Sequence, residues 1–290
     1  MSLRQNLRQL RPLLAFEQAK ARRQHWLLFG MGVVGAMTAL CLVGIYLRVS
    51  SAPGDGAVWF ESILKNYVNG VNFSIATLGA SLMVVFPMLL GVFTASSLAG
   101  EIQAGQIRIM ALRPVSKWAI FLSKYLSLCG YCFSLLLGTL LLSYAVGALV
   151  FGVSGDIFVW DPGIIGGTNK KEFFMKEAVA WQRYGLIYFL SFFTLCSLVA
   201  YFLMCAALLK RTASAIALPL GLYFACHIAE TMPIMDRVCA YLPTKYLFLG
   251  KYSMDLNMDW RPVMHDGMFL CGFTLVFLVV GGIAFCDSDL

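Results

Sequence analysis

The uncharged stretch VNFSIATLGASLMVVFPMLLGVFTASSL, residues 71–98, decides the class of fold. It is longer than the about 20 apolar residues that a helix needs to cross a bilayer. Pro87 lies inside it and should kink the helix. The whole chain has the same character: 60% of its 290 residues are hydrophobic and 13% are charged. Soluble domains have roughly 45–50% apolar and about 25% charged residues. The composition therefore predicts an all-α integral membrane protein.

Five more stretches are long and apolar enough to span a membrane. They are residues 26–47, 118–152, 184–209, 212–229 and 267–286. The third span carries Lys124 near its start, where a long side chain can snorkel to the membrane surface. Lys210-Arg211 implies a tight turn between the fourth and fifth spans. Residues 26–290 are thus expected to form one domain of six spans.

Six spans place both termini on one face of the membrane. The termini, the loop 99–117 and the Lys210-Arg211 turn hold 11 of the 22 Lys and Arg residues. The opposite loops, 48–70, 153–183 and 230–266, are longer in total and hold 10. Because basic residues concentrate in cytoplasmic loops, we expect both termini in the cytoplasm.

The first 25 residues are a separate element. Leucines recur there at near-helical spacing, and arginines stand between them: Arg4, Arg8, Arg11, Arg22 and Arg23. This pattern is typical of an amphipathic helix in the membrane surface, with its arginines toward lipid phosphates. A disordered basic tail is the alternative. Pro12 is expected to break or bend the helix.

The segment GEIQAGQIRIMALRPVSKW, residues 100–118, interrupts the apolar pattern between the second and third spans. Gly100 and Gly105 loosen the backbone. Apolar and polar residues then alternate, and Pro114 and Ser116 indicate a stop followed by the N-cap of the next helix. The pattern predicts a short cytoplasmic helix held by two spans. An ordinary interfacial turn is the alternative, and periodicity does not separate the two.

In its residue types, this segment resembles the ABC-2 type transporter permeases. The similarity consists of an acid, a glycine four residues later, then leucine, proline and a small hydroxyl residue before a helix that holds a lysine: Glu101, Gly105, Leu112, Pro114, Ser116 and Lys124. The family usually has Thr or an acid directly after the glycine, and Gln106-Ile107-Arg108 departs from that. The resemblance is close over residues 101–124 and loose over the remaining chain.

The resemblance implies a transport mechanism. Members pair as two six-span subunits, each docked on a separate nucleotide-binding ATPase, so two ATPase copies bind ATP and Mg. Residues 101–113 would be the coupling helix. Glu101 would hold the loop, Gly105 would permit the turn and Pro114 would end the helix. Arg108 and Arg113 would offer charges to the ATPase, and Ile107 and Met110 would be apolar anchors.

The chain itself has no G-x-x-x-x-G-K-[ST] phosphate-binding loop. The resemblance therefore implies a permease subunit that is not an enzyme and binds no cofactor. It implies an exporter in the bacterial cytoplasmic (inner) membrane, paired with a second copy or a related permease. The second and fifth spans would form the subunit interface.

The outer loops predict less. Residues 230–266 contain aromatic residues, two prolines and isolated charges, which favours short helices dipping into the outer interface over a compact loop. Residues 153–183 predict a loop and a short amphipathic helix, with room for an accessory protein at the outer face. Residues 48–70 are expected to include a surface helix.

Catalytic and metal chemistry find little support. The nine cysteines give no disulfide framework, and Cys129 and Cys132 favour core packing over a metal pair. We expect no catalytic residues, no metal and no nucleic-acid partner. The competing reading is a membrane scaffold or a secondary transporter subunit without an ATPase. A coupled carrier should show charged residues in mid-span and internal repeats, which the sequence does not show. The substrate is not indicated.

Overall fold

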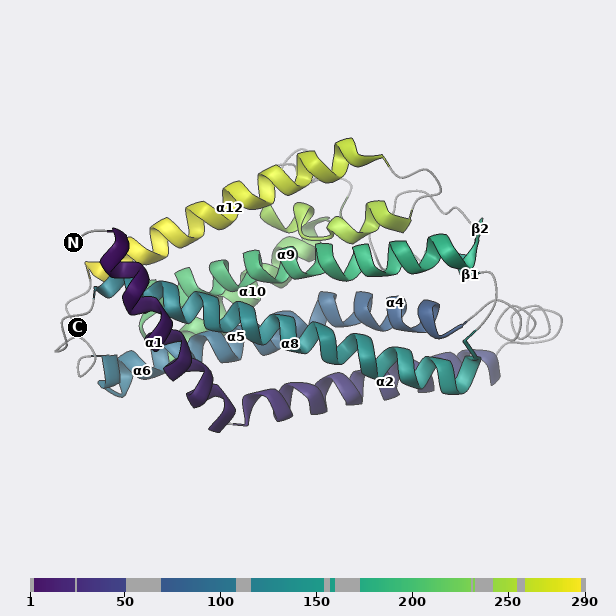
Figure 1. Cartoon of the computed structure of the whole chain (residues 1–290), viewed down its shortest axis with the longest axis horizontal. Helices are drawn as coiled ribbons and strands as arrows, with labels where there is room; N and C mark the ends of the chain where they lie inside the picture. Colours follow the sequence, from purple (N-terminus) through teal and green to yellow (C-terminus); the bar gives the residue numbers. More distant parts are fainter. Residues whose placement is uncertain are drawn as a thin grey trace.

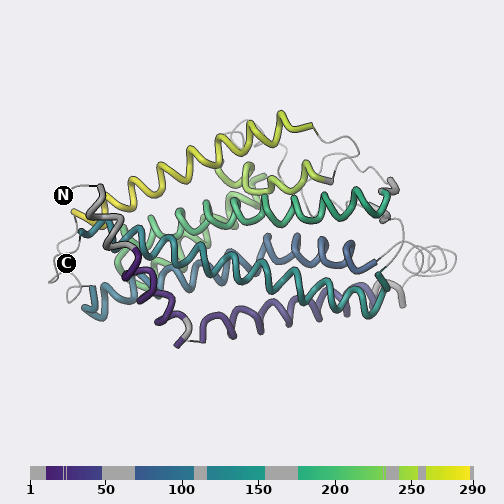
Figure 2. The backbone as a smooth tube through the Cα atoms, viewed as in Figure 1, coloured from purple at the N-terminus to yellow at the C-terminus, as the bar shows by residue number. Residues whose placement is uncertain are grey.

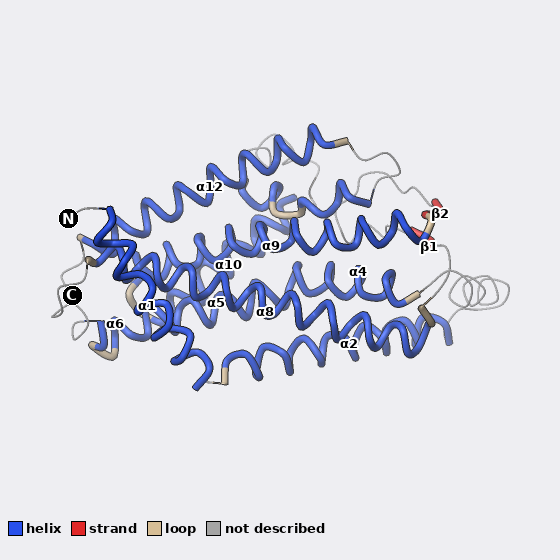
Figure 3. Tube along the Cα trace, viewed as in Figure 1, coloured by secondary structure: helices blue, strands red, loops and turns tan. Residues whose placement is uncertain are grey.

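The structure, a computed structural model, describes residues 3–23, 25–50, 69–107, 116–153, 157–159, 173–230, 232, 242–254 and 259–287; the others are grey in Figure 2. Within this part of the chain, six helices are long and apolar enough to cross a membrane. The protein is an all-α integral membrane protein, as the composition predicts. A pair of three-residue strands, β1 (Ile157–Val159) and β2 (Phe173–Met175), joins antiparallel with Ile157 opposite Met175 (Figure 3).

Six helices follow the six predicted spans, but those of the fourth and sixth spans each begin seven residues earlier than predicted. Before the first span lies α1 (Leu3–Arg23), and the first span is α2 (Trp26–Ser50). The second span is made of α4 (Gly70–Ala80), η1 (Ser81–Val85), α5 (Phe86–Ala95), η2 (Ser96–Gly100) and α6 (Glu101–Gln103). The others are α8 (Lys117–Phe151), α9 (Glu177–Leu209), α10 (Thr212–Glu230) and α12 (Trp260–Cys286). Two 3-10 helices, η4 (Pro243–Tyr246) and η5 (Leu249–Met254), precede α12.

The spans run side by side along the long axis of the molecule. Both termini and α6 lie at one end, which we call the terminal end, and β1 and β2 lie at the other, the β end (Figure 1). Within an apolar 18-residue stretch of each span, 61% of the residues are buried in the second span and in α9, whereas 17% are buried in α2 and in α10 and 22% in α12. The core therefore lies around the second span and α9, and the outer three helices offer their apolar faces to lipid or to a partner.

Local sequence explains where several helices begin. The Asn69 side chain accepts hydrogen bonds from the first amides of α4, and Ser116 caps α8 as predicted, accepting from the Ala119 amide at 3.2 Å. Asp259 caps α12 by accepting from the Arg261 amide at 3.0 Å. The predicted tight turn at Lys210-Arg211 is confirmed, since α9 ends at Leu209 and α10 begins at Thr212.

The second span is not a regular helix. Its π-helical turn η1 ends two residues before Pro87, and a π-turn is one way in which a helix absorbs a break in its hydrogen-bond ladder. Proline has no amide to offer the carbonyl four residues earlier, which is that of Met83. The Tyr223 hydroxyl of α10 donates to this carbonyl at 3.5 Å. The break is thus partly satisfied from a neighbouring helix.

The helices α4 and α8 approach each other through small residues. A Cβ added at Gly147 would lie 2.9 Å from the Gly70 Cα atom, which means that the backbones are in contact. One turn further along each helix, the Ser74 hydroxyl lies 2.6 Å from that of Ser143. Ser74 also bonds the hydroxyls of Tyr184 and Tyr188 of α9, at 2.9 and 2.8 Å. Small-residue contacts with shared hydroxyl bonds are a common way to join membrane helices.

Several expectations need correction or stay open. Pro12 does not break α1, which is one helix over Leu3–Arg23; Pro12 is exposed, so the carbonyl that it frees can be satisfied by water or lipid headgroups. The short amphipathic helix expected within 153–183 is wrong, because residues 177–183 are the first turns of α9. The short helices before the last span are present as η4 and η5. The surface helix expected within 48–70 falls largely outside the described residues.

Candidate functional site

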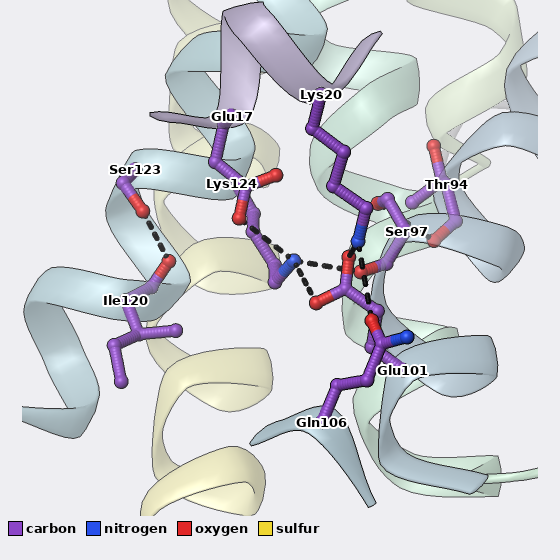
Figure 4. Close-up of polar contacts among 9 residues, drawn as sticks. All are labelled: Glu17, Lys20, Thr94, Ser97, Glu101, Gln106, Ile120, Ser123 and Lys124. Atoms are coloured by element: carbon purple, nitrogen blue, oxygen red, sulfur yellow. Dashed lines mark hydrogen bonds and ion pairs between the residues drawn. The ribbon is translucent and has the colours of Figure 1, made fainter. Parts of the chain in front are cut away.

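A cluster of four charged side chains lies inside the terminal end (Figure 4). At its centre is Lys124 of α8, whose Nζ donates to Glu101 Oε2 at 2.8 Å and to Glu17 Oε1 at 3.1 Å. The same Nζ donates to the Ser97 carbonyl at 2.8 Å. Lys20 of α1 donates to Glu101 Oε1 at 2.6 Å. The cluster therefore joins α1, the end of the second span and α8.

The cluster is buried and electrically balanced. The Lys124 side chain is 0% exposed, Glu101 is 6%, Glu17 is 8% and Lys20 is 23% exposed. A buried charge is tolerated only when it is paired and hydrogen-bonded, and the three protons of the Lys124 ammonium group have three acceptors. The prediction that Lys124 snorkels to the surface is wrong, because the carboxylates of Glu17 and Glu101 neutralise it in place.

The irregular backbone of the second span leaves one of these acceptors, the Ser97 carbonyl, available to Lys124. In a regular α-helix the Glu101 amide would donate to the Ser97 carbonyl, but directly after the π-helical turn η2 it donates to the Leu98 carbonyl. The Ser97 carbonyl is thus free of that bond and accepts from Lys124. A cavity of about 20 Å³ lies among the charged residues, which is room for about one water molecule. Such π-turns recur at functional sites.

The segment predicted to couple to an ATPase begins at this cluster. Glu101 is held by two lysines of its own chain, which agrees with its expected role in holding the loop. Gly105 has φ +68°, in the left-handed region that other residues avoid, and nothing lies within 4 Å of an added Cβ. Gly105 is therefore required by backbone conformation rather than by space.

Ile107 does not have its predicted role. Its side chain is 0% exposed and belongs to the hydrophobic core of the bundle. The prediction that Ile107 is an apolar anchor for a partner is wrong, because other residues of the same chain already cover its side chain. Arg108, Met110, Arg113 and Pro114, and the resembling Leu112, lie outside the described residues.

Sequence reasoning missed a second link from this segment. The Gln103 side-chain oxygen accepts from the Thr212 hydroxyl at 2.6 Å and from the Thr212 amide at 3.4 Å. Thr212 is the first residue of α10, so a side chain of α6 caps the start of a helix that is distant in sequence. Residues 101–107 are thus bonded to α1, α8 and α10.

Sequence reasoning also missed Glu17 and Lys20. Two signals were available: Glu17 is the one acid among the first 25 residues, and Lys124 is a charge inside an apolar span. Of the predicted membrane-surface arginines, Arg11 and Arg23 are exposed on α1. Arg4, Arg8 and Arg22 lie on the same helix, and their side chains are outside the described part. Their contact with lipid stays a prediction.

Other polar groups form smaller sites. His227 and Glu230 lie 3.5 Å apart at the end of α10. At the β end, Asp266 accepts from the Tyr252 hydroxyl at 2.6 Å and lies 3.7 Å from Lys251, which ties η5 to α12. Burial lowers the pKa of Lys251, and the nearby Asp266 carboxylate opposes this shift. Among the described residues, no group of three or more His, Cys, Asp or Glu side chains could hold a metal ion.

A comparison with known protein families matches most of the chain, including two of the four residues of the charge cluster. Residues 32–290 match the model of the family described as "Protein of unknown function (DUF2705)". The match includes Glu101 and Lys124, while Glu17 and Lys20 of α1 precede it. No curated protein matches the chain.

Proposed function

The chain belongs to the DUF2705 family, whose description gives no function. From the charge cluster and the segment that it holds, we propose that the chain is the membrane permease subunit of an ATP-driven ABC exporter. The subunit forms the translocation pathway as a dimer, with a second copy or a related permease. Residues 101–113 couple it to a separate ATPase, and both termini are in the cytoplasm of a bacterial cell. ATP and Mg bind to the ATPase.

The charge cluster is the observation that carries this proposal. A coupling segment must be exposed to its partner and yet rigidly joined to the spans, so that movement of the ATPase reaches the membrane. Residues 101–107 have this property, because Glu101 is bonded to α1 and α8 and Gln103 to α10. Gln103, Ala104 and Gln106 are exposed at the terminal end. An ordinary interfacial turn does not need bonds to three other helices.

The burial of the second and fifth spans indicates which of the two can form the dimer interface. The resemblance implies both, but in the apolar stretch of the second span 61% of the residues are buried within its own subunit. This span lies against α2, α8, α9 and α10, and its exposed large apolar side chains are confined to one stripe of Val84, Met88 and Val92. In the apolar stretch of the fifth span, α10, 17% of the residues are buried. We therefore assign the contact with the second permease to α10.

Damage to the segment should uncouple the protein without unfolding it. Gly105→Val places a β-branched residue at φ +68°, which costs about 1–2 kcal/mol and distorts the turn. Arg108→Glu reverses a charge offered to the partner. We expect both variants to insert normally and to lose most of the ATPase. The measurement is the amount of ATPase, identified by mass spectrometry and ATP hydrolysis, that co-purifies with the detergent-extracted protein.

Two matched variants serve as controls. Gly105→Asn should retain the ATPase, because asparagine tolerates the left-handed region. Arg261→Glu makes the same charge change at the exposed start of α12, at the β end, and should also retain it. If wild type brings down no ATPase, or if Gly105→Val and Arg108→Glu bind it normally, the scaffold or secondary-transporter alternative replaces this proposal.

The proposed orientation predicts a labelling pattern in intact cells. Single cysteines at Thr168 and Asn257 should react with an impermeant thiol reagent, and one at Gln103 should not. Cys239 lies in an outer loop of the same topology, so the variants carry Cys239→Ser to remove its signal. The reverse pattern, labelling at Gln103 alone, contradicts the topology and the coupling assignment with it.

A further inference from the structure

The turn between α9 and α10 lies directly beside the proposed coupling segment. Thr212, which follows Lys210-Arg211, is bonded to Gln103 through both its hydroxyl and its amide. Gln103, Lys210 and Arg211 are all exposed. The turn and residues 101–107 therefore form one continuous surface at the terminal end, although more than a hundred residues separate them in sequence.

Lys210 has an unfavourable backbone for a lysine. Its φ is +53° and its ψ is −3°, the left-handed conformation, and its amide closes α9 by donating to the Ala206 carbonyl. Glycine is the usual residue at such a position, because other side chains are strained there. Closing the helix does not need the lysine side chain. A strained residue that the local structure does not require suggests a function for its side chain.

The exposed charge of the terminal end is mostly basic. Glu17 and Glu101 are neutralised by Lys124 and Lys20 within the charge cluster. Among the described residues, the exposed charged side chains at this end are Arg11, Arg23, Lys210, Arg211 and Asp287. Asp287 adjoins Cys286, whose carbonyl binds Lys117 at 2.8 Å. The surface around the turn thus fits a partner of negative charge.

We propose that the Lys210-Arg211 turn is a second docking point, which binds acidic side chains of the same ATPase that residues 101–113 engage. This inference rests on the proposed function and extends it to α10. Gln103 then joins the two docking points, so that the ATPase moves α6 and the start of α10 together. Anionic lipid is the other class of partner for a basic turn. A lysine anywhere in the last turn of α9 could reach lipid headgroups, because its stem is long and flexible. Lipid binding therefore does not account for a lysine at the strained position.

The test uses Lys210→Gly/Arg211→Gln, with the wild-type chain in nanodiscs and the ATPase identified by co-purification as the probe. Lys210→Gly relieves the strained backbone while it removes the charge. We expect the melting temperature not to fall and the dissociation constant for the ATPase to rise roughly 3- to 10-fold, as for two exposed charge contacts. The salt dependence of binding should become shallower. Lys245→Gln/Arg261→Gln removes two exposed charges at the β end and should leave binding unchanged.

Each outcome decides the proposal. Weaker binding in nanodiscs of pure phosphatidylcholine and in those with added phosphatidylglycerol supports it. Loss of the effect in pure phosphatidylcholine overturns it in favour of anionic lipid. If the double variant binds like wild type while Arg108→Glu binds weakly, the second docking point is overturned and the exporter proposal stands. If the ATPase does not bind wild type, both proposals are overturned.

Discussion

Lys124→Met is expected to destabilise the protein by about 3–5 kcal/mol, the range for removing one partner of a buried ion pair. Methionine has a similar length but no charge, so Glu17 is left without a cation and Glu101 keeps only Lys20. The Ser97 carbonyl loses its donor as well. The measurement is the free energy of unfolding in detergent micelles, followed by denaturant titration or by the melting temperature.

Lys20→Met is the matched control for this prediction. Lys20 binds the same Glu101 carboxylate, but its side chain is 23% exposed, and exposed ion pairs contribute about 1 kcal/mol or less. The double variant Glu17→Gln/Lys124→Met should be more stable than Lys124→Met alone, because it removes the carboxylate that has lost its cation, while Glu101 keeps Lys20. If Lys124→Met unfolds no more easily than Lys20→Met, the buried cluster does not stabilise the terminal end.

Gly147→Val is expected to destabilise the protein by about 1–3 kcal/mol or more, because overpacking a close contact strains its neighbours. The new Cβ would lie 2.9 Å from the Gly70 Cα atom and 3.1 Å from the Gly70 carbonyl oxygen. These are backbone atoms and cannot turn aside, so α4 and α8 must separate. The separation also pulls Ser143 away from Ser74, whose bonds reach Tyr184 and Tyr188.

Gly130→Val is the control on the same helix. Gly130 is exposed on α8, and nothing lies within 4 Å of an added Cβ. Valine should fit there with little effect on the melting temperature. Equal effects of the two valine substitutions would show that the loss does not come from the contact with α4.

The spans could be predicted because each is a property of local sequence. A helix in lipid satisfies its own backbone hydrogen bonds, so a long apolar stretch is enough to define it. The caps at Ser116 and the turn at Lys210-Arg211 were predicted for the same reason, since they depend on a few adjacent residues. The starts of α9 and α12 were predicted too late, because charged residues within 177–183 and 260–266 interrupt the apolar pattern while the helix continues through them.

The candidate site could be predicted only in part. Glu101 and Gly105 were identified, and Gly105 shows the conformation that its residue type suggests. Ile107 was assigned to the outside because it stands in a mixed polar and apolar segment, but sequence spacing does not reveal which neighbours cover a side chain. The links from Glu17, Lys20 and Thr212 were missed because each joins residues far apart along the chain.

The membrane class, the number of spans and the charged segment between the second and third spans follow from the sequence alone. The physical reason is that transfer to lipid depends on composition over about 20 residues, which a sequence states directly. Only the tertiary structure decided that Lys124 is buried, that Glu101 joins three elements, and that Gln103 caps α10. A charge enters a low-dielectric interior only where opposite charges converge on it, and that convergence depends on how helices distant in sequence pack together.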